Sequence, residues 1–328
     1  LVFGTEKRGL DIPTVSEHFE TNIPGLFIAG ELGGMGLIRN AIEQGKQAMD
    51  SIRKIKGIGK DKELDVIIVG AGPAGFSASL SAKQHGLRAV TLEQDSLGGT
   101  VFNFPRGKVV MTAPVNLPIV GKVKIRETTK EALLKMWLEI EKKTQLKINY
   151  KEKMDDIKPT TDGFEVVTNK KTYQTRAILL TIGRRGTPRK LGVPGEELPK
   201  VIYSLMDPAE FVDKHVLIVG GGDSALEAAL SIADEAGTQV TISYRSESFS
   251  RAKQKNQDKI KEAVEKSNLK LILPSTVKII DKDTVTLNAG DNEEIIKNDG
   301  IIVCAGGILP TPFLKQIGID VETKHGQV

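Results

Sequence analysis

Three glycines in the spacing G-x-G-x-x-G, Gly70, Gly72 and Gly75, directly follow the apolar run 66–69. Such a β-branched run predicts a strand buried on both faces, and the Ala- and Ser-rich stretch after the glycines predicts a helix. Glycines at this turn let the backbone approach a pyrophosphate, which then lies at the positive N-terminus of the helix. Glu93 ends the next predicted strand, where a carboxylate accepts the hydroxyls of an adenosine ribose. The candidate dinucleotide ligands are Gly70, Gly72, Pro73, Ala74, Gly75 and Glu93.

A second turn of the same kind follows the apolar run 216–219 and has the spacing G-x-G-x-x-A. An NAD site needs a carboxylate at the end of the next strand, to accept the 2′-hydroxyl of the ribose. This chain instead has Arg245 there, and Arg251 follows soon after. A guanidinium pairs with a phosphate in a forked geometry, so the pattern favours NADPH over NADH. The candidate ligands are Gly220, Gly222, Asp223, Ser224, Ala225, Arg245, Ser246 and Arg251.

A third glycine-rich stretch lies near the start of the chain, where the apolar run 26–28 leads to Gly30 and Glu31. Further glycines surround Met35, and residues 37–52 have the pattern of a helix. A glycine-rich start suits a helix N-terminus that approaches an electron-rich group.

Residues 97–105 form another glycine-rich loop after Glu93. Gly98 and Gly99 can bring backbone N–H groups against a flat ring, and the Asn103 amide can meet the polar edge of that ring. The alternative is an ordinary glycine-rich loop in which Asn103 is a turn residue.

The segments between these sites have weaker sequence signals for secondary structure. Residues 108–124 have the composition of an irregular stretch, and residues 147–177 predict short alternating strands. Thr128 and Glu131 have the spacing of a capping box before a helix, in which Trp137 has core-facing spacing.

Composition excludes several classes of partner. The 328 residues suffice for two domains, and the net charge of +4 is mixed along the chain, so neither nucleic acid nor a membrane surface is predicted as a partner. The sequence contains no run of about 18 apolar residues, so no membrane span is predicted. With Cys304 as the single cysteine, no internal disulfide and no C-x-x-C pair can form, which suits a cytoplasmic protein. None of the histidines lies beside a nucleophile or a ligand set, so no catalytic side chain and no metal site is predicted.

Residues 23–31, with the sequence Ile-Pro-Gly-Leu-Phe-Ile-Ala-Gly-Glu, resemble the last flavin motif of the two-dinucleotide-binding-domain flavoproteins. The resemblance is strongest to the thioredoxin-reductase-type group, in which the motif reads T-x-x-P-G-(L/V)-(F/Y)-A-A-G-D. In that family its acid binds the ribityl chain of FAD, and the next helix points at the isoalloxazine ring. The resemblance implies FAD contacts at Gly30, Glu31 and Met35. Glu31 stands where the family usually has Asp.

Other segments resemble the same family. Residues 178–183 resemble its A-T-G segment, residues 97–105 the flavin-side loop of bacilliredoxin reductases, and residues 306–314 its G-x-x-P-N-T-x-x-L segment. Residues 244–252 resemble the H-R-R-x-x-F-R-A signature for NADPH, with the spacing changed by one. The further cofactor contacts that these resemblances imply are Gly99, Thr100, Asn103, Thr181, Gly183 and Gly306.

The flavin motif comes first here, whereas it lies near the C-terminus in the family, so the order of motifs is rotated. The chain is then either circularly permuted or cut from a longer tandem. A linker of about a dozen residues spans about 40 Å when extended, so we expect the N-terminal segment to close its own domain rather than that of a neighbouring copy. The expected fold class is α/β, with two Rossmann-like three-layer domains and the NADPH domain inserted into the FAD domain. The expected FAD domain is 1–186 with 307–328, of which 1–53 supplies the flavin motif, and the expected NADPH domain is 187–306.

Missing cysteines shape the functional prediction. A thioredoxin reductase passes electrons through a dithiol, and bacilliredoxin reductases have a Cys where this chain has Ala74. Cys304 lies in an apolar run, which is typical of a core residue. We therefore expect an FAD-dependent NADPH oxidoreductase, working as a homodimer, whose electrons pass to an external acceptor. That acceptor is an iron–sulfur protein, an adjoining module, a quinone or oxygen. The alternatives are a redox-inert or regulatory dinucleotide-binding module, and a disulfide reductase that uses Cys304 or an external dithiol.

Overall fold

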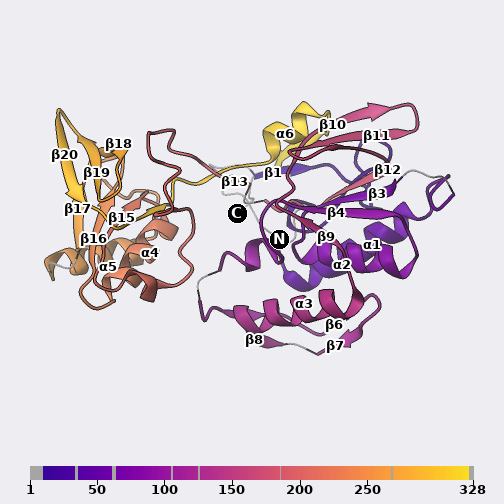
Figure 1. The fold of residues 1–328 in the computed structure, drawn as a ribbon, viewed down its shortest axis with the longest axis horizontal. Coiled ribbons are helices and arrows are strands. Elements are labelled where there is room, and N and C mark those ends of the chain that lie inside the picture. The colour runs from indigo at the N-terminus through magenta and orange to yellow at the C-terminus, as the bar shows by residue number, and fades with distance from the viewer. Residues whose placement is uncertain are drawn as a thin grey trace. The chain divides into compact units, whose positions relative to one another are not determined.

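The computed structural model describes residues 10–33, 36–60, 64–104, 106–124, 126–184, 186–266 and 269–324 (Figure 1). It divides into unit 1, which is Leu1–Gly186 with Leu309–Val328, and unit 2, which is Thr187–Ile308. The sequence places the second boundary after residue 306. The structure places it after Ile308, because β22 (Gly307–Ile308) pairs with β13 (Thr187–Pro188) inside unit 2.

A seven-stranded sheet forms the centre of unit 1. Its strand order is β10-β11-β12-β3-β4-β9, and β2 pairs with β12 as well. The pairs that β3 makes with β4 and β12 are parallel, and Val66, Ile67 and Ile68 of β3 are fully buried, as predicted for a strand covered on both faces. The strands are β2 (Leu26–Ile28), β3 (Leu64–Val69), β4 (Ala89–Glu93), β9 (Ile148–Tyr150), β10 (Met154–Thr160), β11 (Gly163–Thr168) and β12 (Thr172–Leu180).

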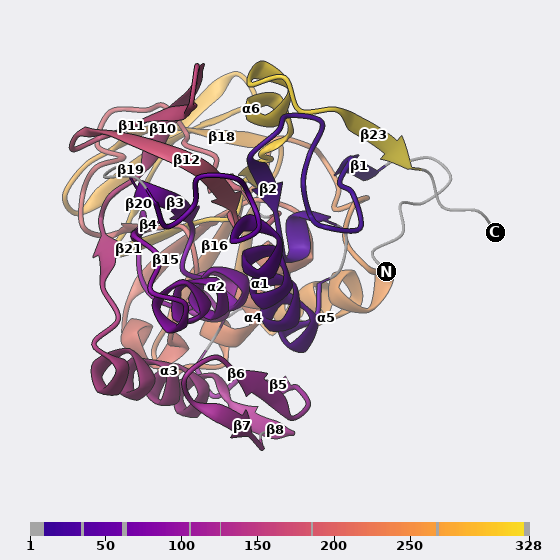
Figure 2. The same cartoon turned by 90° about the vertical axis from the view of Figure 1, so that its right-hand side faces the viewer.

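Helices cover both faces of this sheet. On one face α1 (Ile38–Ile52) and α2 (Pro73–Gln84) lie side by side (Figure 2) and bury Val66 and Ile68. On the other face Leu314 of α6 (Thr311–Gln316) packs with Ile67. The helix α3 (Lys130–Thr144) packs on α2, with the rings of Trp137 and Phe76 5.9 Å apart between centroids. Trp137 is 1% exposed, which confirms its predicted place in the core.

Two local predictions are wrong. Residues 108–124 are not irregular, because they contain three strands of two short antiparallel pairs, β5 with β8 and β6 with β7. The cap of α3 is Thr129 rather than Thr128, since the Thr129 hydroxyl accepts the Ala132 N–H at 3.2 Å while Thr128 lies in β8. These strands are β5 (Val109–Met111), β6 (Val115–Leu117), β7 (Gly121–Val123) and β8 (Glu127–Thr129).

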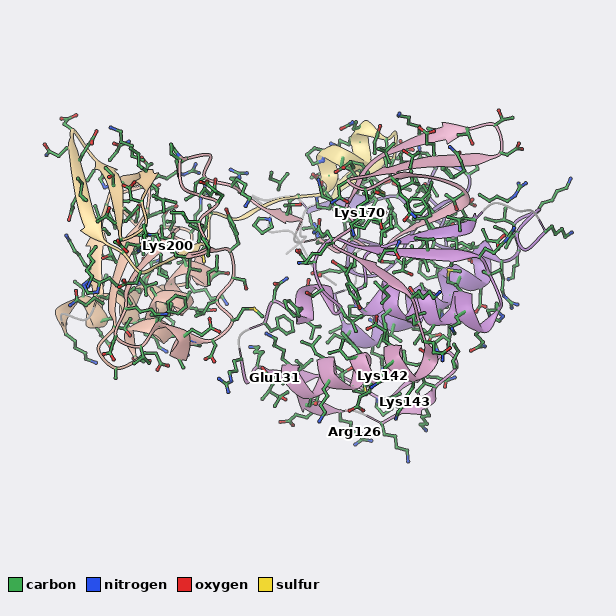
Figure 3. All side chains as sticks on the ribbon, viewed as in Figure 1. Arg126, Glu131, Lys142, Lys143, Lys170 and Lys200 are labelled. Atoms are coloured by element: carbon green, nitrogen blue, oxygen red, sulfur yellow. The ribbon has the colours of Figure 1, made fainter. Side chains whose placement is uncertain are left out.

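The charged side chains at the two ends of α3 complement its helix dipole. Glu131 lies in the first turn, and Lys142 and Lys143 lie in the last (Figure 3). Acids near the positive N-terminus and bases near the negative C-terminus both stabilise a helix.

The N-terminal segment belongs to the sheet of its own chain. Leu26 and Ile28 of β2 lie opposite Ile178 and Leu180 of β12. The residues that follow α1 fold back in turns rather than extending, and Ile58 is buried in the core shared by α1 and α2. At the other end of the chain, β23 (Val321–Lys324) pairs antiparallel with β1 (Leu10–Pro13).

The carboxylate of Asp65 fixes the turns that lead from α1 to β3. This buried carboxylate accepts the Gly59 backbone N–H at 2.7 Å and lies 2.9 Å from Nη2 of Arg88. Burial opposes ionisation of Asp65, but these hydrogen bonds and the Arg88 charge outweigh it and lower its pKa.

Unit 2 is a second three-layer fold. Its parallel sheet has the order β14-β21-β15-β16-β17. One face is covered by α4 (Asp223–Ala233) and α5 (Gln254–Glu265), and the other by the antiparallel sheet β18-β19-β20, whose Val285 and Leu287 pack with Leu217 of β15. The strands are β14 (Val201–Ile202), β15 (His215–Val219), β16 (Gln239–Ser243), β17 (Leu269–Ile272), β18 (Ser275–Ile280), β19 (Thr284–Ala289), β20 (Asn292–Lys297) and β21 (Gly300–Val303). Within the described residues, the short 3-10 helices are η1 (Glu31–Gly33) and η2 (Gly99–Val101) in unit 1 and η3 (Pro208–Phe211) in unit 2.

None of the helices in the described ranges combines the length and the apolar character that crossing a bilayer requires.

Candidate cofactor-binding sites

The first glycine turn joins β3 to α2 and leaves room for a ligand above its middle glycine. Gly70 has φ +102, and a Cβ there would lie 2.7 Å from the Thr181 carbonyl oxygen. A Cβ at Gly75 would overlap the Gly70 carbonyl oxygen, so the helix can start this close to the strand only with glycine. Gly72 caps α2 and is followed by Pro73. A Cβ at Gly72 would have no neighbouring atom within 4 Å. The open space therefore lies at the N-terminus of α2, where a pyrophosphate is stabilised.

Glu93 is fixed beside this turn. Its side chain is 6% exposed, and its two carboxylate oxygens accept the backbone N–H groups of Ala71 and Asp95, each at 2.7 Å. Burial raises the pKa of Glu93, and the two backbone hydrogen bonds oppose that rise. The carboxylate predicted to accept ribose hydroxyls is thus held at the end of β4.

The N-terminal glycine stretch packs against the same turn. A Cβ at Gly30 would lie 3.1 Å from Cβ of Ala74, and the Gly30 N–H donates to Oε1 of Gln44 at 2.8 Å. Gly45, in the middle of α1, lies so close to Ala74 that a Cβ would overlap the Ala74 carbonyl oxygen. Glu31 begins η1 and is half-buried, whereas Met35 lies outside the described residues. The structure thus brings Gly30 and Ala74 together, although they are far apart in sequence.

The loop after Glu93 lies over the first glycine turn. The Gly98 N–H donates to the Ala71 carbonyl at 2.9 Å, and a Cβ at Gly99 would lie 3.2 Å from Cα of Gly72. Asn103 is exposed, and its amide donates to the Gly99 carbonyl at 3.4 Å. Thr100 lies in η2 and is half-buried.

Thr181, a predicted cofactor contact, binds the first glycine turn through its side chain. Its hydroxyl donates to the carbonyl oxygens of Val69 and Gly70, at 2.8 and 2.9 Å. The side chain therefore fixes the glycine turn from behind. Gly183 follows two residues later, beyond the end of β12.

Two residues that the sequence does not single out help to hold this region. Gln44 accepts the Gly30 N–H, as described above. Lys130 is 5% exposed, and its ammonium group donates to the Phe104 carbonyl at 2.6 Å and lies 5.7 Å from the centroid of the Phe102 ring. Burial lowers the pKa of Lys130. Neither contact has a local sequence signal, because the partners are 14 and 26 residues apart.

The second glycine turn joins β15 to α4 in unit 2. A Cβ at Gly220 would lie 2.6 Å from the Cys304 carbonyl oxygen, and Gly222 faces open space at the cap of α4. Ala225 is fully buried where the first turn has Gly75, and Ser224 lies beside it in the first turn of α4. This turn therefore has the same arrangement as the first, with an open N-terminus for a pyrophosphate.

The residues after β16 carry the predicted 2′-phosphate ligands. Arg245 and Arg251 are exposed, and Ser246 is half-buried. In the same segment the rings of Tyr244 and Phe249 stack, with centroids 5.9 Å apart and planes at 20°. Gly306 lies further along, after β21, and its carbonyl accepts the Arg189 N–H at 3.0 Å.

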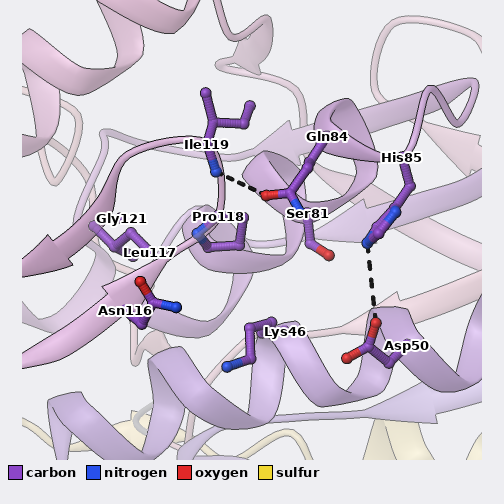
Figure 4. A pocket seen from close by; sticks show the side chains of 10 residues that line it. All are labelled: Lys46, Asp50, Ser81, Gln84, His85, Asn116, Leu117, Pro118, Ile119 and Gly121. Atoms are coloured by element: carbon purple, nitrogen blue, oxygen red, sulfur yellow. Dashed lines mark hydrogen bonds and ion pairs between the residues drawn. The ribbon is translucent and has the colours of Figure 1, made fainter.

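Unit 1 has a cavity of about 480 Å³, whose lining residues Figure 4 shows. It lies between α1, the C-terminal end of α2 and the hairpin of β6 and β7. Gln84 accepts the Ile119 N–H at 2.8 Å on one side, and His85 lies 4.0 Å from Asp50 on the other. Because Gln84 ends the helix that Pro73 begins, the cavity is separated from the predicted pyrophosphate position by the length of α2. In the described part of the chain, no cluster of three or more His, Cys, Asp or Glu side chains could hold a metal ion.

Two Rossmann-type units, each with a glycine turn at the start of a helix, define the class of proteins that bind two dinucleotides. The sequence profile of the pyridine nucleotide-disulphide oxidoreductases matches residues 67–328, and the chain belongs to this family. Membership confirms the predicted fold class, the predicted enzyme class and the predicted cofactors, FAD and NADPH.

Individual relatives give the same assignment. The ferredoxin–NADP reductase of Acholeplasma laidlawii is 33% identical over 79% of this chain and 79% of its own length, and that of Ignicoccus hospitalis is 30% identical over 80% and 83%. The bacilliredoxin reductase Bdr of Bacillus subtilis is 28% identical over 80% and 82%. Among solved structures, the bacillithiol disulfide reductase Bdr of Staphylococcus aureus has a TM-score of 0.57, at 26% identity over 80% of this chain and 84% of that one.

Proposed function

We propose that the chain transfers hydride from NADPH to FAD and passes the electrons to an external protein acceptor rather than to a disulfide of its own. The observation that carries this proposal is the cysteine content. A disulfide relay within the chain needs two thiols, and this chain has Cys304 alone.

The position of Cys304 supports the same proposal. It follows β21 and packs on the core of unit 2, and burial raises the pKa of its thiol to about 11. Since the thiolate is the nucleophile in exchange with a disulfide, a thiol with such a pKa reacts slowly near neutral pH. The relatives named as ferredoxin–NADP reductases favour an iron–sulfur protein as the acceptor.

The side chains and turns of the protein would bind and orient the cofactors, and the bound flavin would supply the redox chemistry. Unit 1 would hold FAD through the first glycine turn, Glu93 and the loop with Asn103. Unit 2 would hold NADPH through its glycine turn, and Arg245 and Arg251 would bind the 2′-phosphate. The chain segments that join the units, next to Gly186 and to Ile308, are the candidate hinges for bringing nicotinamide and flavin together.

The acceptor assignment can be tested with two acceptors and one variant. We expect NADPH-dependent reduction of a bacterial ferredoxin, followed through cytochrome c, and no comparable reduction of a small aromatic disulfide. The Cys304→Ser variant should keep the ferredoxin rate within about twofold, because a thiol with a raised pKa contributes nothing to the transfer. Loss of the ferredoxin rate in Cys304→Ser, or faster turnover with the disulfide, would exclude the proposal.

A further inference from the structure

The carboxylate of Asp223 ties the start of α5 to the first residue of the nucleotide helix α4. Its Oδ1 accepts the Lys253 backbone N–H at 2.8 Å and a side-chain N–H of Asn256 at 2.7 Å. The same amide nitrogen of Asn256 also donates to Oε1 of Glu227, at 3.1 Å. Glu227 lies one turn further along α4. One buried amide, 9% exposed, thus bridges two carboxylates of α4 from the first turn of α5.

The segment that precedes this bridge carries both predicted 2′-phosphate ligands. It is anchored at Phe249 and Ala252, which are buried in the core of α4 and α5. A second side-chain contact, from Nε2 of Gln257 to the Ala252 carbonyl at 2.9 Å, fixes its last turn. Arg251 lies between the two anchors, and Arg245 lies just before them. The position of the segment that carries both arginines therefore depends on how α5 is attached to α4.

Asp223 is an acid at the start of the predicted phosphate-binding helix, and the bridge turns its carboxylate towards the start of α5. The backbone N–H of Lys253, together with the Asn256 amide, holds the pKa of Asp223 below its usual value. The carboxylate directs its Oδ1 to these two donors at the start of α5.

We propose that Asn256 is a positioning residue for recognition of the 2′-phosphate of NADPH. Together with Asp223 it sets the place of the loop that carries Arg245 and Arg251, without touching the nucleotide. The inference rests on the proposed NADPH site and adds a residue that the glycine motif and the arginine signature do not contain.

The test is calorimetric binding of 2′,5′-ADP and of 5′-AMP, which differ only in the 2′-phosphate, to the full chain. Wild type is expected to prefer 2′,5′-ADP. In Asn256→Ala, which removes the hydrogen bonds to both Asp223 and Glu227, we expect this preference to fall about tenfold. Binding of 5′-AMP should stay within about twofold, whereas general damage to unit 2 would weaken both ligands equally.

Two further variants sharpen the result. Gln257→Ala breaks the second contact at a half-buried position and should lower the preference by a smaller factor even if Asn256→Ala does not fold. Glu262→Ala, at an exposed position of the same helix, should change neither affinity. Full retention of the preference in a folded Asn256→Ala protein would overturn the positioning role alone. A wild-type protein with no preference for 2′,5′-ADP would overturn the NADPH site itself.

Discussion

Replacement of Gly45 by valine is expected to abolish retention of FAD. Gly45 of α1 lies directly against Ala74 of α2, and even a single Cβ would overlap the Ala74 carbonyl oxygen. Valine adds two more methyl groups, so α1 must move away from the first glycine turn. Overpacking of this kind costs about 3 kcal/mol or more when backbone has to shift. The expected result is a lower melting temperature and a colourless protein after gel filtration.

The control for this variant lies two residues along the same helix. Gln47 is exposed, so Gln47→Ala should keep both the melting temperature and the flavin content of the wild type. A Gly45→Val protein with wild-type flavin content would show that the N-terminal segment does not form part of the FAD site.

Loss of both predicted phosphate ligands is the second large effect that we expect. In the double variant Arg245→Ala with Arg251→Ala, kcat/KM for NADPH should fall about 100-fold, since each charged hydrogen bond contributes about 1.5 kcal/mol or more and 1.4 kcal/mol is a factor of ten. The value for NADH should hardly change, because NADH has no 2′-phosphate. Steady-state reduction of ferredoxin with each nucleotide measures both values.

A charge-matched control separates specific binding from the general field of the protein. Lys259→Ala with Lys261→Ala also removes two positive charges, from exposed positions on α5, and should leave the ratio of NADPH to NADH rates unchanged. An equal fall of both rates in the arginine variant would contradict the assignment of Arg245 and Arg251 to the 2′-phosphate.

The sequence predicts best the features that are local. The strand, turn and helix around Gly70 to Gly75 and around Gly220 to Ala225 are present as β3 with α2 and as β15 with α4. Each depends on a few adjacent residues whose backbone conformation and packing demand glycine or alanine. The apolar run before each turn likewise predicts its own burial.

Features that depend on distant partners could not be predicted in this way. The strands in 108–124 are three residues long, and β5 finds its partner only in β8. Gln44, Lys130 and Asn256 bind partners between 14 and 33 residues away, with no repeated spacing that would mark them. The hydroxyl of Thr181 donates to the carbonyls of Val69 and Gly70, more than 110 residues away in the sequence, and no local pattern marks that contact.

The roles of the individual cofactor ligands and the homodimer stay predictions. The rotated order of motifs has a structural counterpart, because β2 and α1 lie in unit 1 beside the first glycine turn. The match to the family begins at residue 67, beyond this segment.

The most direct test is a visible absorption spectrum of the purified full chain under argon, followed by one equivalent of NADPH or, separately, NADH. The account predicts a bound flavin whose visible band bleaches rapidly with NADPH and much more slowly with NADH. A flavin band that neither nucleotide bleaches would contradict the proposed hydride transfer and leave a redox-inert dinucleotide-binding module as the better description.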